Sequence, residues 1–259
     1  MENFMRLQNS SVKINENMTL LQDSRGLTFG TDAYLLSAFV SGGSKKRAAD
    51  LGSGTGVISL LCQSRHKFSH VYAVEVQENF AELIEQNSKQ NLLEDKITAI
   101  HADLRDICPS DTDGELDCVF ANPPYMKVDS GKRNQHDEKF IARHEVFGGI
   151  GDFCACAYRL LKHGGKFCTV WRPDRLTDLI CALRANRLEP KVMIFVHAYP
   201  SAPPSMVITE AVKGGASGNK LYPPLYLSNS LEDSKKSILS ADAKRIYDTC
   251  SFEDFLNQK

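Results

Sequence analysis

The chain has 259 residues, of which 42% are hydrophobic, and this is enough to bury a sizeable core in one large domain. Its formal net charge of −1 argues against strong nonspecific binding to nucleic acid. Eight cysteines follow no disulfide-framework spacing, no secretion signal is visible and no apolar run could span a membrane, so we expect a cytoplasmic protein.

The first predicted helix begins near Gly30-Thr31-Asp32 and runs through Tyr34, Leu35, Leu36 and Phe39. Asp and Thr are common at a helix N-cap, where a side-chain oxygen accepts from the first N–H groups of the helix. The pattern therefore predicts that Thr31-Asp32 caps this helix, with Asp32 at the N-cap.

A glycine-rich turn joins the next predicted strand and helix. The strand ends in Ala48-Ala49-Asp50-Leu51, and the turn contains Gly52, Gly54 and Gly56. Glycine allows a positive φ and lets a ligand approach the backbone closely. The glycine spacing differs from the dinucleotide fingerprint, which disfavours a nicotinamide oxidoreductase. Asp50 is unfavourable beside a pyrophosphate and suits a ligand with positive charge or donors, such as the amino-acid end of S-adenosylmethionine.

Two acidic residues follow the next two predicted strands. Glu75 ends the run 71–74, and Asp103 lies just past the run 97–101. A carboxylate at the first position commonly accepts from both ribose hydroxyls, and one at the second can accept from an adenine amino group. Singly, each could be a solvated loop carboxylate or a helix cap. With Asp50, they follow the carboxyl ends of successive strands, and this favours a ligand site at that edge.

The apolar run 116–121 predicts a buried strand that ends at Asn122-Pro123-Pro124-Tyr125. Two consecutive prolines cannot continue a strand ladder, so the chain must turn there. The Asn122 amide and the carbonyls near the prolines can accept the two N–H groups of a planar amino group. Tyr125 offers an aromatic face on which a planar substrate can stack. A turn that merely ends the strand is the alternative, and the preceding motifs favour the site.

A basic excess begins directly after this motif. Between Lys127 and Lys191 there are thirteen Lys and Arg against eight Asp and Glu, whereas the rest of the chain is net negative. Residues in the first part of this stretch are predicted to contact a phosphate-bearing substrate: Lys127, Lys132, Arg133, Lys139 and Arg143. Others are expected to be solvated residues on helix faces: Arg159, Lys162, Arg184 and Arg187.

The rest of the chain alternates between helical and strand patterns. Helices are predicted over 80–90, 152–161 and 176–183, and strands over 166–170, 192–196 and 206–211. The glycines of 163–165 are expected to stop the second of these helices. A glycine-rich junction at 214–218 precedes a weakly amphipathic segment over 232–247. Cys154, Cys156 and Cys168 are expected in the core and no metal is expected, because the chain has no Cys-x2-Cys pair and its histidines are dispersed.

The order Asp50, glycine turn, Glu75, Asp103 and Asn122-Pro-Pro-Tyr resembles a class I S-adenosylmethionine-dependent methyltransferase that modifies amino groups. The resemblance covers roughly residues 25 to 213. Four further segments are similar to a narrower group, the bacterial tRNA1(Val) adenine-N6-methyltransferase-like proteins, which modify the adenine beside the anticodon. These segments are Gln22-x3-Gly26-x2-Phe29-Gly30-Thr31-Asp32-Ala33-x-Leu35-Leu36, Arg143-His144-Glu145, Lys213-Gly214-Gly215 and Pro223-Pro224-Leu225.

The resemblance implies an α/β, Rossmann-like fold: a seven-stranded, mostly parallel sheet with helices on both faces and an antiparallel last strand. It implies an N-terminal extension over 1–45 that packs on the core, a methyltransferase domain over 46–213 and a C-terminal tail over 214–259. It also implies a set of S-adenosylmethionine-binding residues, in which Gly30-Thr31-Asp32 closes over the methionine portion. The set is Thr31, Asp32, Asp50, Gly52, Gly54, Gly56, Glu75, Val76, Asp103, Leu104 and Asn122.

The expected activity is methylation of the exocyclic N6 amino group of an adenine in RNA, with the anticodon loop of tRNA as the expected substrate. Asn122, Pro123, Pro124 and Tyr125 would be catalytic, through acceptors for the amino group and a stacking ring. The alternatives are an amino group of rRNA, of DNA or of a protein glutamine, and a silent module that only binds cofactor or RNA.

Overall fold

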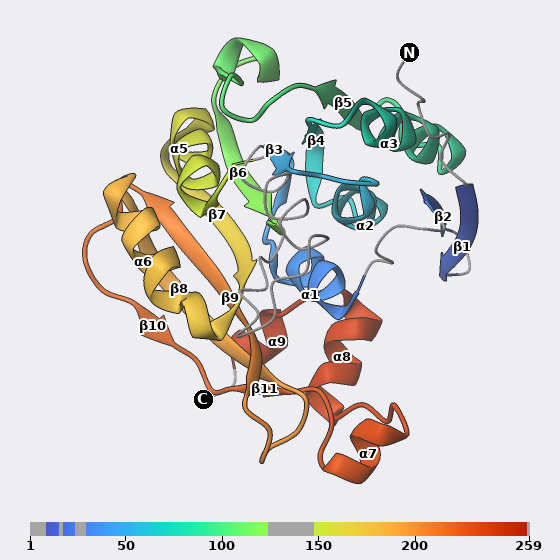
Figure 1. The fold of residues 1–259 in the computed structure, drawn as a ribbon, viewed down its shortest axis with the longest axis vertical. Coiled ribbons are helices and arrows are strands. Elements are labelled where there is room, and N and C mark those ends of the chain that lie inside the picture. The colour runs from blue at the N-terminus through green and yellow to red at the C-terminus, as the bar shows by residue number, and fades with distance from the viewer. Residues whose placement is uncertain (1–8, 16–17, 24–29, 124–147, 258–259) are drawn as a thin grey trace, which may run out of the picture.

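The computed structural model describes residues 9–15, 18–23, 30–123 and 148–257. They form an open sheet with helices on both faces (Figure 1). The strands run in the spatial order β10-β8-β9-β7-β6-β3-β4-β5, and β11 also pairs with β8. The strands of this sheet are β3 (Gly43–Leu51), β4 (Phe68–Glu75), β5 (Ile97–His101), β6 (Leu116–Ala121), β7 (Leu161–Trp171), β8 (Leu188–His197), β9 (Pro204–Lys213), β10 (Lys220–Leu221) and β11 (Leu225–Tyr226).

The predicted fold class is confirmed: the sheet is parallel except at β9, which pairs antiparallel with both β7 and β8. Among the described residues the sheet has nine strands where seven were predicted, because β10 and β11 add two short parallel pairings to the edge of β8. Each of these strands has only two residues, too few for a periodic pattern in the sequence.

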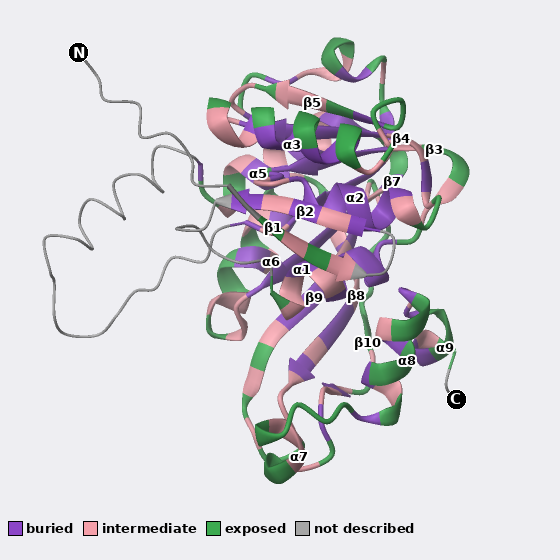
Figure 2. Cartoon of the chain, turned by 90° about the vertical axis from the view of Figure 1, so that its right-hand side faces the viewer, coloured by how far each residue is buried: buried purple, intermediate pink, exposed green. Residues whose placement is uncertain are grey.

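Alternation along the strands divides the core into two layers. Cys118 and Phe120 of β6 face one layer, which also contains buried residues of α1, α2 and α8. Val119 and Ala121 face the other, which contains buried residues of α5 and α6. Figure 2 shows buried residues along the strands and exposed ones on α7. The helices are α1 (Thr31–Phe39), α2 (Val57–Ser64), α3 (Glu78–Gln90), α5 (Ile150–Leu160), α6 (Leu176–Ala185), α7 (Leu231–Lys235), α8 (Ala241–Thr249) and α9 (Glu253–Leu256), with 3-10 turns η1 (Pro109–Thr112) and η2 (Pro173–Arg175).

An N-terminal hairpin, β1 (Asn9–Asn15) with β2 (Met18–Asp23), is tied to α3 by a buried amide. The Asn87 side chain accepts from the Leu21 N–H at 2.6 Å and donates to the Leu21 carbonyl at 2.9 Å. Its amide nitrogen also donates to the carbonyl of Thr55, in the glycine-rich turn, at 2.9 Å. One side chain therefore joins the hairpin, α3 and that turn.

The junction of α5 and β7 differs from the prediction. The helix ends at Leu160, before the glycines that were expected to stop it, and β7 starts at once. Leu161 is fully buried, has extended backbone angles and pairs with Leu116. Burial of Leu161 in the sheet therefore ends the helix, and Gly164-Gly165 falls within an irregularity in the pairing of β6 with β7.

The segment after Gly214 is packed onto the core. The expected amphipathic stretch is two helices, α7 and α8, and α8 lies beside α1 (Figure 1). The rings of Tyr34 and Tyr247 stack with centroids 4.5 Å apart, and the Tyr34 hydroxyl donates to the Tyr247 carbonyl at 2.8 Å. At the other end of α1, the ammonium of Lys67 donates to the carbonyls of Ser37, Ala38 and Val40 at 2.6, 3.0 and 2.9 Å. Both ends of α1 are therefore held.

Candidate functional site

The register of the sheet brings three sequence motifs to one edge. Leu51 of β3 pairs with Val74 of β4 on one side and with Ala121 of β6 on the other. The next residues along these strands are Gly52, Glu75 and Asn122, so they follow at the same carboxyl edge. In open α/β sheets this is the edge at which ligands bind.

Gly52, Gly54 and Gly56 all have positive φ, of +65°, +56° and +80°. Gly54 is the most open of them: a Cβ built there would meet no described atom within 4 Å. A ligand can therefore lie against the backbone at this point. Any other residue here would strain the backbone, and its side chain would fill the space.

Asp50 is a buried carboxylate with one oxygen satisfied and one not. It is 1% exposed, and its Oδ2 accepts from the hydroxyls of Ser53 and Ser59, both at 2.8 Å. Its Oδ1 has no hydrogen-bond partner among the residues that the structure describes. Burial raises the pKa of Asp50 to about 6, against the opposing effect of the two serine hydrogen bonds. A donor with positive charge would satisfy the orphaned oxygen.

Glu75 is 5% exposed and holds the turn from the neighbouring strand. Its Oε2 accepts the Gly54 N–H at 2.9 Å, and its Oε1 accepts the Gln77 N–H at 2.9 Å. A carboxylate has about four acceptor sites, so these bonds leave capacity for hydroxyl donors. The sequence predicted a ligand-facing role for Glu75, and it gave no sign of this contact with Gly54.

Asp103 is engaged by Arg105, two residues further on. The Arg105 Nε donates to both carboxylate oxygens at 2.9 and 3.0 Å, and a guanidinium NH2 completes the ion pair. The hydrogen bonds from Arg105 lower the pKa of Asp103. An adenine amino group bound there would share the carboxylate with Arg105.

The segments beside these carboxylates are fixed through their backbone carbonyls. His101 hydrogen-bonds the Val76 carbonyl at 3.1 Å, and Arg159 donates to the carbonyls of Leu104 and Ile107 at 2.8 and 2.5 Å. Arg159 was expected to be a solvated helix-face residue, and this was wrong. Its guanidinium ties α5 to the loop after β5, a tertiary contact that helical spacing does not reveal.

Asn122 binds α1 rather than standing alone. Its Nδ2 donates to Asp32 Oδ2 at 2.9 Å, and Asp32 Oδ1 accepts the N–H of Ala33 at 2.9 Å. The prediction that Asp32 is the N-cap was wrong: the N-cap is Gly30, and it makes no side-chain capping bond. Pro123, next to Asn122, is buried.

The remaining predicted site residues lie outside the described part of the chain. They are Pro124, Tyr125, Lys127, Lys132, Arg133, Lys139 and Arg143. Thr31, at the start of α1, is half-buried.

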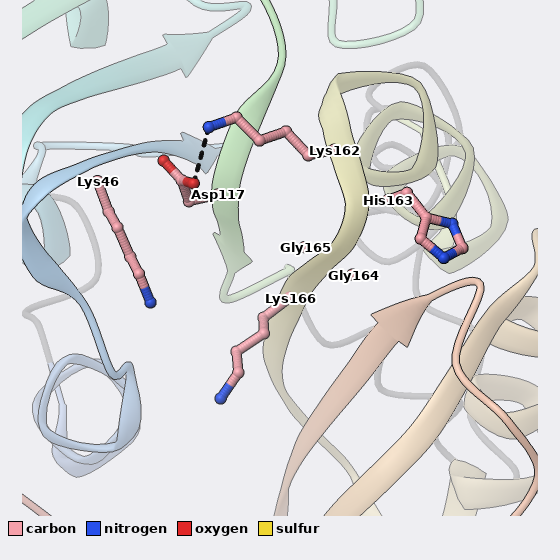
Figure 3. Close-up of a pocket in the computed structure, with 7 residues that line it drawn as sticks. All are labelled: Lys46, Asp117, Lys162, His163, Gly164, Gly165 and Lys166. Atoms are coloured by element: carbon pink, nitrogen blue, oxygen red, sulfur yellow. Dashed lines mark hydrogen bonds and ion pairs between the residues drawn. The ribbon is translucent and has the colours of Figure 1, made fainter.

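A cavity of about 130 Å³ lies elsewhere, at the amino ends of β6 and β3 and the start of β7 (Figure 3). Its walls include Lys46, Lys166 and the ion pair of Lys162 with Asp117 at 2.9 Å, while the His163 ring points away from Lys46 (Figure 3). This cavity opens at the opposite end of the strands from Asn122, so it is separate from the motif site.

Within 9–15, 18–23, 30–123 and 148–257, no group of three His, Cys, Asp or Glu is arranged to hold a metal ion. Burial raises the pKa of Cys154 and Cys156 to about 12, so these thiols stay protonated. No helix in the same ranges has the length and apolar character of a membrane span.

Comparison with known sequences matches this chain to a protein family. The family model described as the methyltransferase small domain matches residues 24–178. A relative from Phocaeicola vulgatus, named tRNA1(Val) (adenine(37)-N6)-methyltransferase, is 28% identical over 197 residues, which are 74% of this chain and 80% of the relative. One of the same name from Aliivibrio salmonicida is 32% identical over 141 residues, 54% of this chain and 58% of the relative.

Solved structures resemble the fold. A predicted O-methyltransferase from Agrobacterium tumefaciens has a TM-score of 0.62 at 20% identity, covering 81% of this chain and 98% of that one. TYW2 of M. jannaschii in complex with AdoMet has a TM-score of 0.52 at 16% identity, covering 80% and 86%. These likenesses concern the fold alone.

Proposed function

Because the chain belongs to the methyltransferase small domain family, we propose that it transfers a methyl group from S-adenosylmethionine to the N6 amino group of an adenine in tRNA. Membership makes it an S-adenosylmethionine-dependent methyltransferase. The relatives named for adenine 37 of tRNA1(Val) support the base, the position and the RNA class. The observation that carries the proposal is the Asn122 amide, fixed at the same sheet edge as Asp50 and Glu75.

The residues of this edge fit the cofactor. The orphaned Asp50 Oδ1 suits the ammonium of a methionine portion, and the open backbone at Gly54 gives the cofactor room. Glu75 would accept hydrogen bonds from the ribose hydroxyls of the cofactor, and Asp103 would accept one from the amino group of its adenine. The adenine ring of the cofactor would lie between Val76 and Leu104. When bound, the cofactor supplies a methyl group made electrophilic by its sulfonium.

The chain's own contribution to the chemistry is to hold and polarise the target amino group. Its lone pair is delocalised into the adenine ring and is weakly nucleophilic. The Asn122 Oδ1 and the Pro123 carbonyl would accept its two N–H groups, which concentrates electron density on the nitrogen. The same acceptors stabilise the positive charge that develops there, and the proton can leave afterwards without a dedicated base.

Residues outside the described ranges complete the proposal from the sequence alone. Tyr125 would stack on the target base, which must leave its own stack to enter the site. Lys127, Lys132, Arg133, Lys139 and Arg143 would contact the RNA backbone. A base in an anticodon loop is already single-stranded, so its extrusion costs less.

We also propose a cytoplasmic protein, supported by eight cysteines that are all free thiols. The catalytic core would be 46–213, with 1–45 and 214–259 as supporting segments. α1 and α8, on either side of this core in the sequence, pack against each other through the stacked rings of Tyr34 and Tyr247.

The test is methyl transfer from labelled S-adenosylmethionine to unmodified bulk tRNA, followed by nucleoside analysis. N6-methyladenosine formed by the wild type and lost in Asn122→Ala would establish the reaction. If the wild type binds the cofactor but transfers no label to tRNA, tRNA is rejected as the substrate. It would direct the search to rRNA, DNA and protein glutamine.

A further inference from the structure

One hydrogen bond joins the motif residue Asn122 to a residue 90 positions away in the chain. The Asn122 Nδ2 lies 2.9 Å from Asp32 Oδ2, and both side chains are half-buried. The Asp32 carboxylate is held at two points, because its other oxygen accepts the Ala33 N–H at 2.9 Å. The second of these contacts lies within α1, so the carboxylate has an anchor besides Asn122.

We propose that Asp32 is a positioning residue for methyl transfer: it sets the amide of Asn122 with the nitrogen toward α1 and the oxygen toward the substrate amino group. The inference rests on the proposed amino-group methylation. An ionised carboxylate only accepts hydrogen bonds, so the NH2 of the amide must face it. A flipped amide would set its oxygen against the carboxylate and offer donors to a substrate group that itself donates. Asp32 thereby selects the acceptor orientation.

The helix that carries Asp32 is anchored at both ends. The Tyr34 ring stacks on Tyr247 with an interplanar angle of 11°, and Lys67 holds the other end of α1. Tyr247 belongs to α8, which lies outside the matched family region of 24–178. The C-terminal segment thus supports the active-site amide through α1.

A positioning role for Asp32 and a direct contact of Asp32 with the cofactor predict different effects on kcat and on cofactor affinity. A residue that binds the cofactor lowers affinity for it when removed. A residue that orients Asn122 lowers kcat and leaves cofactor affinity nearly intact, because Asn122 acts on the substrate amino group.

The decisive experiment exchanges the two side chains. Asp32→Ala is expected to lower kcat by roughly 10- to 100-fold, the loss of one charge-assisted hydrogen bond, with the cofactor Kd within about threefold of wild type. Asp32→Asn keeps an acceptor oxygen, so its kcat should fall less.

Asn122→Asp sets two carboxylates against each other and should be nearly inactive. The double variant Asp32→Asn/Asn122→Asp restores a donor–acceptor pair, and its kcat should exceed that of Asn122→Asp by about tenfold or more.

Glu78→Ala is the matched control, because it removes an exposed first-turn carboxylate from α3, at the same end of the sheet. Its kcat should equal that of the wild type. Failure of the exchange to restore any activity in a folded protein would overturn the proposal. So would a loss of cofactor affinity in Asp32→Ala as large as the loss of kcat.

An NMR measurement that needs no substrate tests the pairing of Asp32 with Asn122 independently of the proposed function. In protein labelled with ¹⁵N-asparagine, the Asn122 side-chain amide signals are identified by their absence in Asn122→Asp. They should shift strongly in Asp32→Ala and stay in place in Glu78→Ala. Unshifted signals in Asp32→Ala would mean that the pair does not form, whatever the substrate. A wild type that methylates no tRNA adenine, with the shift present, would instead reject only the proposed function.

Discussion

The carboxylate of Glu75 accepts the backbone N–H of Gly54 across 2.9 Å, so the end of β4 holds the turn that follows β3. The same side chain is the proposed acceptor for ribose hydroxyls. Glu75→Ala removes both interactions, and we expect the cofactor Kd to rise by about tenfold or more. Glu75→Gln keeps one acceptor oxygen and should lose less. Isothermal titration calorimetry measures both constants, and an unchanged Kd in folded Glu75→Ala would reject the assignment.

The ionisation of Asp50 makes the free energy of unfolding depend on pH in a predictable direction. Its pKa is raised from 3.8 unfolded to about 6 folded, so between these values the folded state binds more protons than the unfolded state. The free energy of unfolding therefore falls as pH rises from about 4 to 6, by up to about 3 kcal/mol, and this contribution is constant above that window.

The uncharged variant Asp50→Asn lacks this titration. The stability difference, variant minus wild type, should increase with pH between about 4 and 6 and then level off, because other titrating groups are common to both proteins. Urea unfolding at several pH values measures it. A difference that stays flat across pH 4 to 7 would show that Asp50 ionises normally.

Arg159 and Arg184 form a matched pair on neighbouring helices, since the sequence indicates solvated residues for both. Arg159 donates to three backbone carbonyls of the loop after β5, whereas the contact that the described residues show for the exposed Arg184 side chain is an ion pair with Glu189 at 3.4 Å. Arg159→Ala should lower the free energy of unfolding by about 2 kcal/mol, and Arg184→Ala by less than about 0.5 kcal/mol. Equal effects in urea unfolding would contradict the contact.

Tyr247 joins the C-terminal segment to the core by its stacked ring. Tyr247→Ala removes the contact with Tyr34 and should cost about 3 kcal/mol of stability. Tyr34→Phe keeps the stack and loses only the hydroxyl bond to the Tyr247 carbonyl, at a cost of about 1 kcal/mol. Thermal unfolding distinguishes the two, and a Tyr247→Ala protein as stable as Tyr34→Phe would contradict this packing.

Patterns local in sequence predicted the central part of the fold well. The strands over 97–101 and 116–121 have the predicted bounds, because buried apolar runs flanked by polar turns are readable without tertiary information. The helix over 80–90 is confirmed with a two-residue extension at its start. Motifs at strand ends also gave the common sheet edge, since parallel strands bring their carboxyl ends together.

Features that depend on long-range contact were missed. Asp32 and Asn122 were both singled out, but no pattern connects residues 90 positions apart, so Asp32 was assigned to helix capping and to the cofactor and not to Asn122. The end of α5 was misplaced because burial of Leu161 against β6 decides it, not the following glycines. Two-residue strands such as β10 take their conformation from the edge of β8, and their own sequence carries no strand signal.

The position of β9 between β7 and β8 has a consequence for synthesis on the ribosome. Strands β3 to β6, which carry Asp50 and Glu75 and end just before Asn122, can pair as soon as residue 121 has emerged. In the part of the chain that the structure describes, β7 and β8 are joined only through β9, so β8 cannot enter the sheet until residues 204–213 have followed. Until then β7 presents a row of unpaired backbone groups, which is an edge open to mispairing with another chain. We therefore expect the half that carries the proposed cofactor site to fold during translation, and the sheet to be completed only near the end of synthesis.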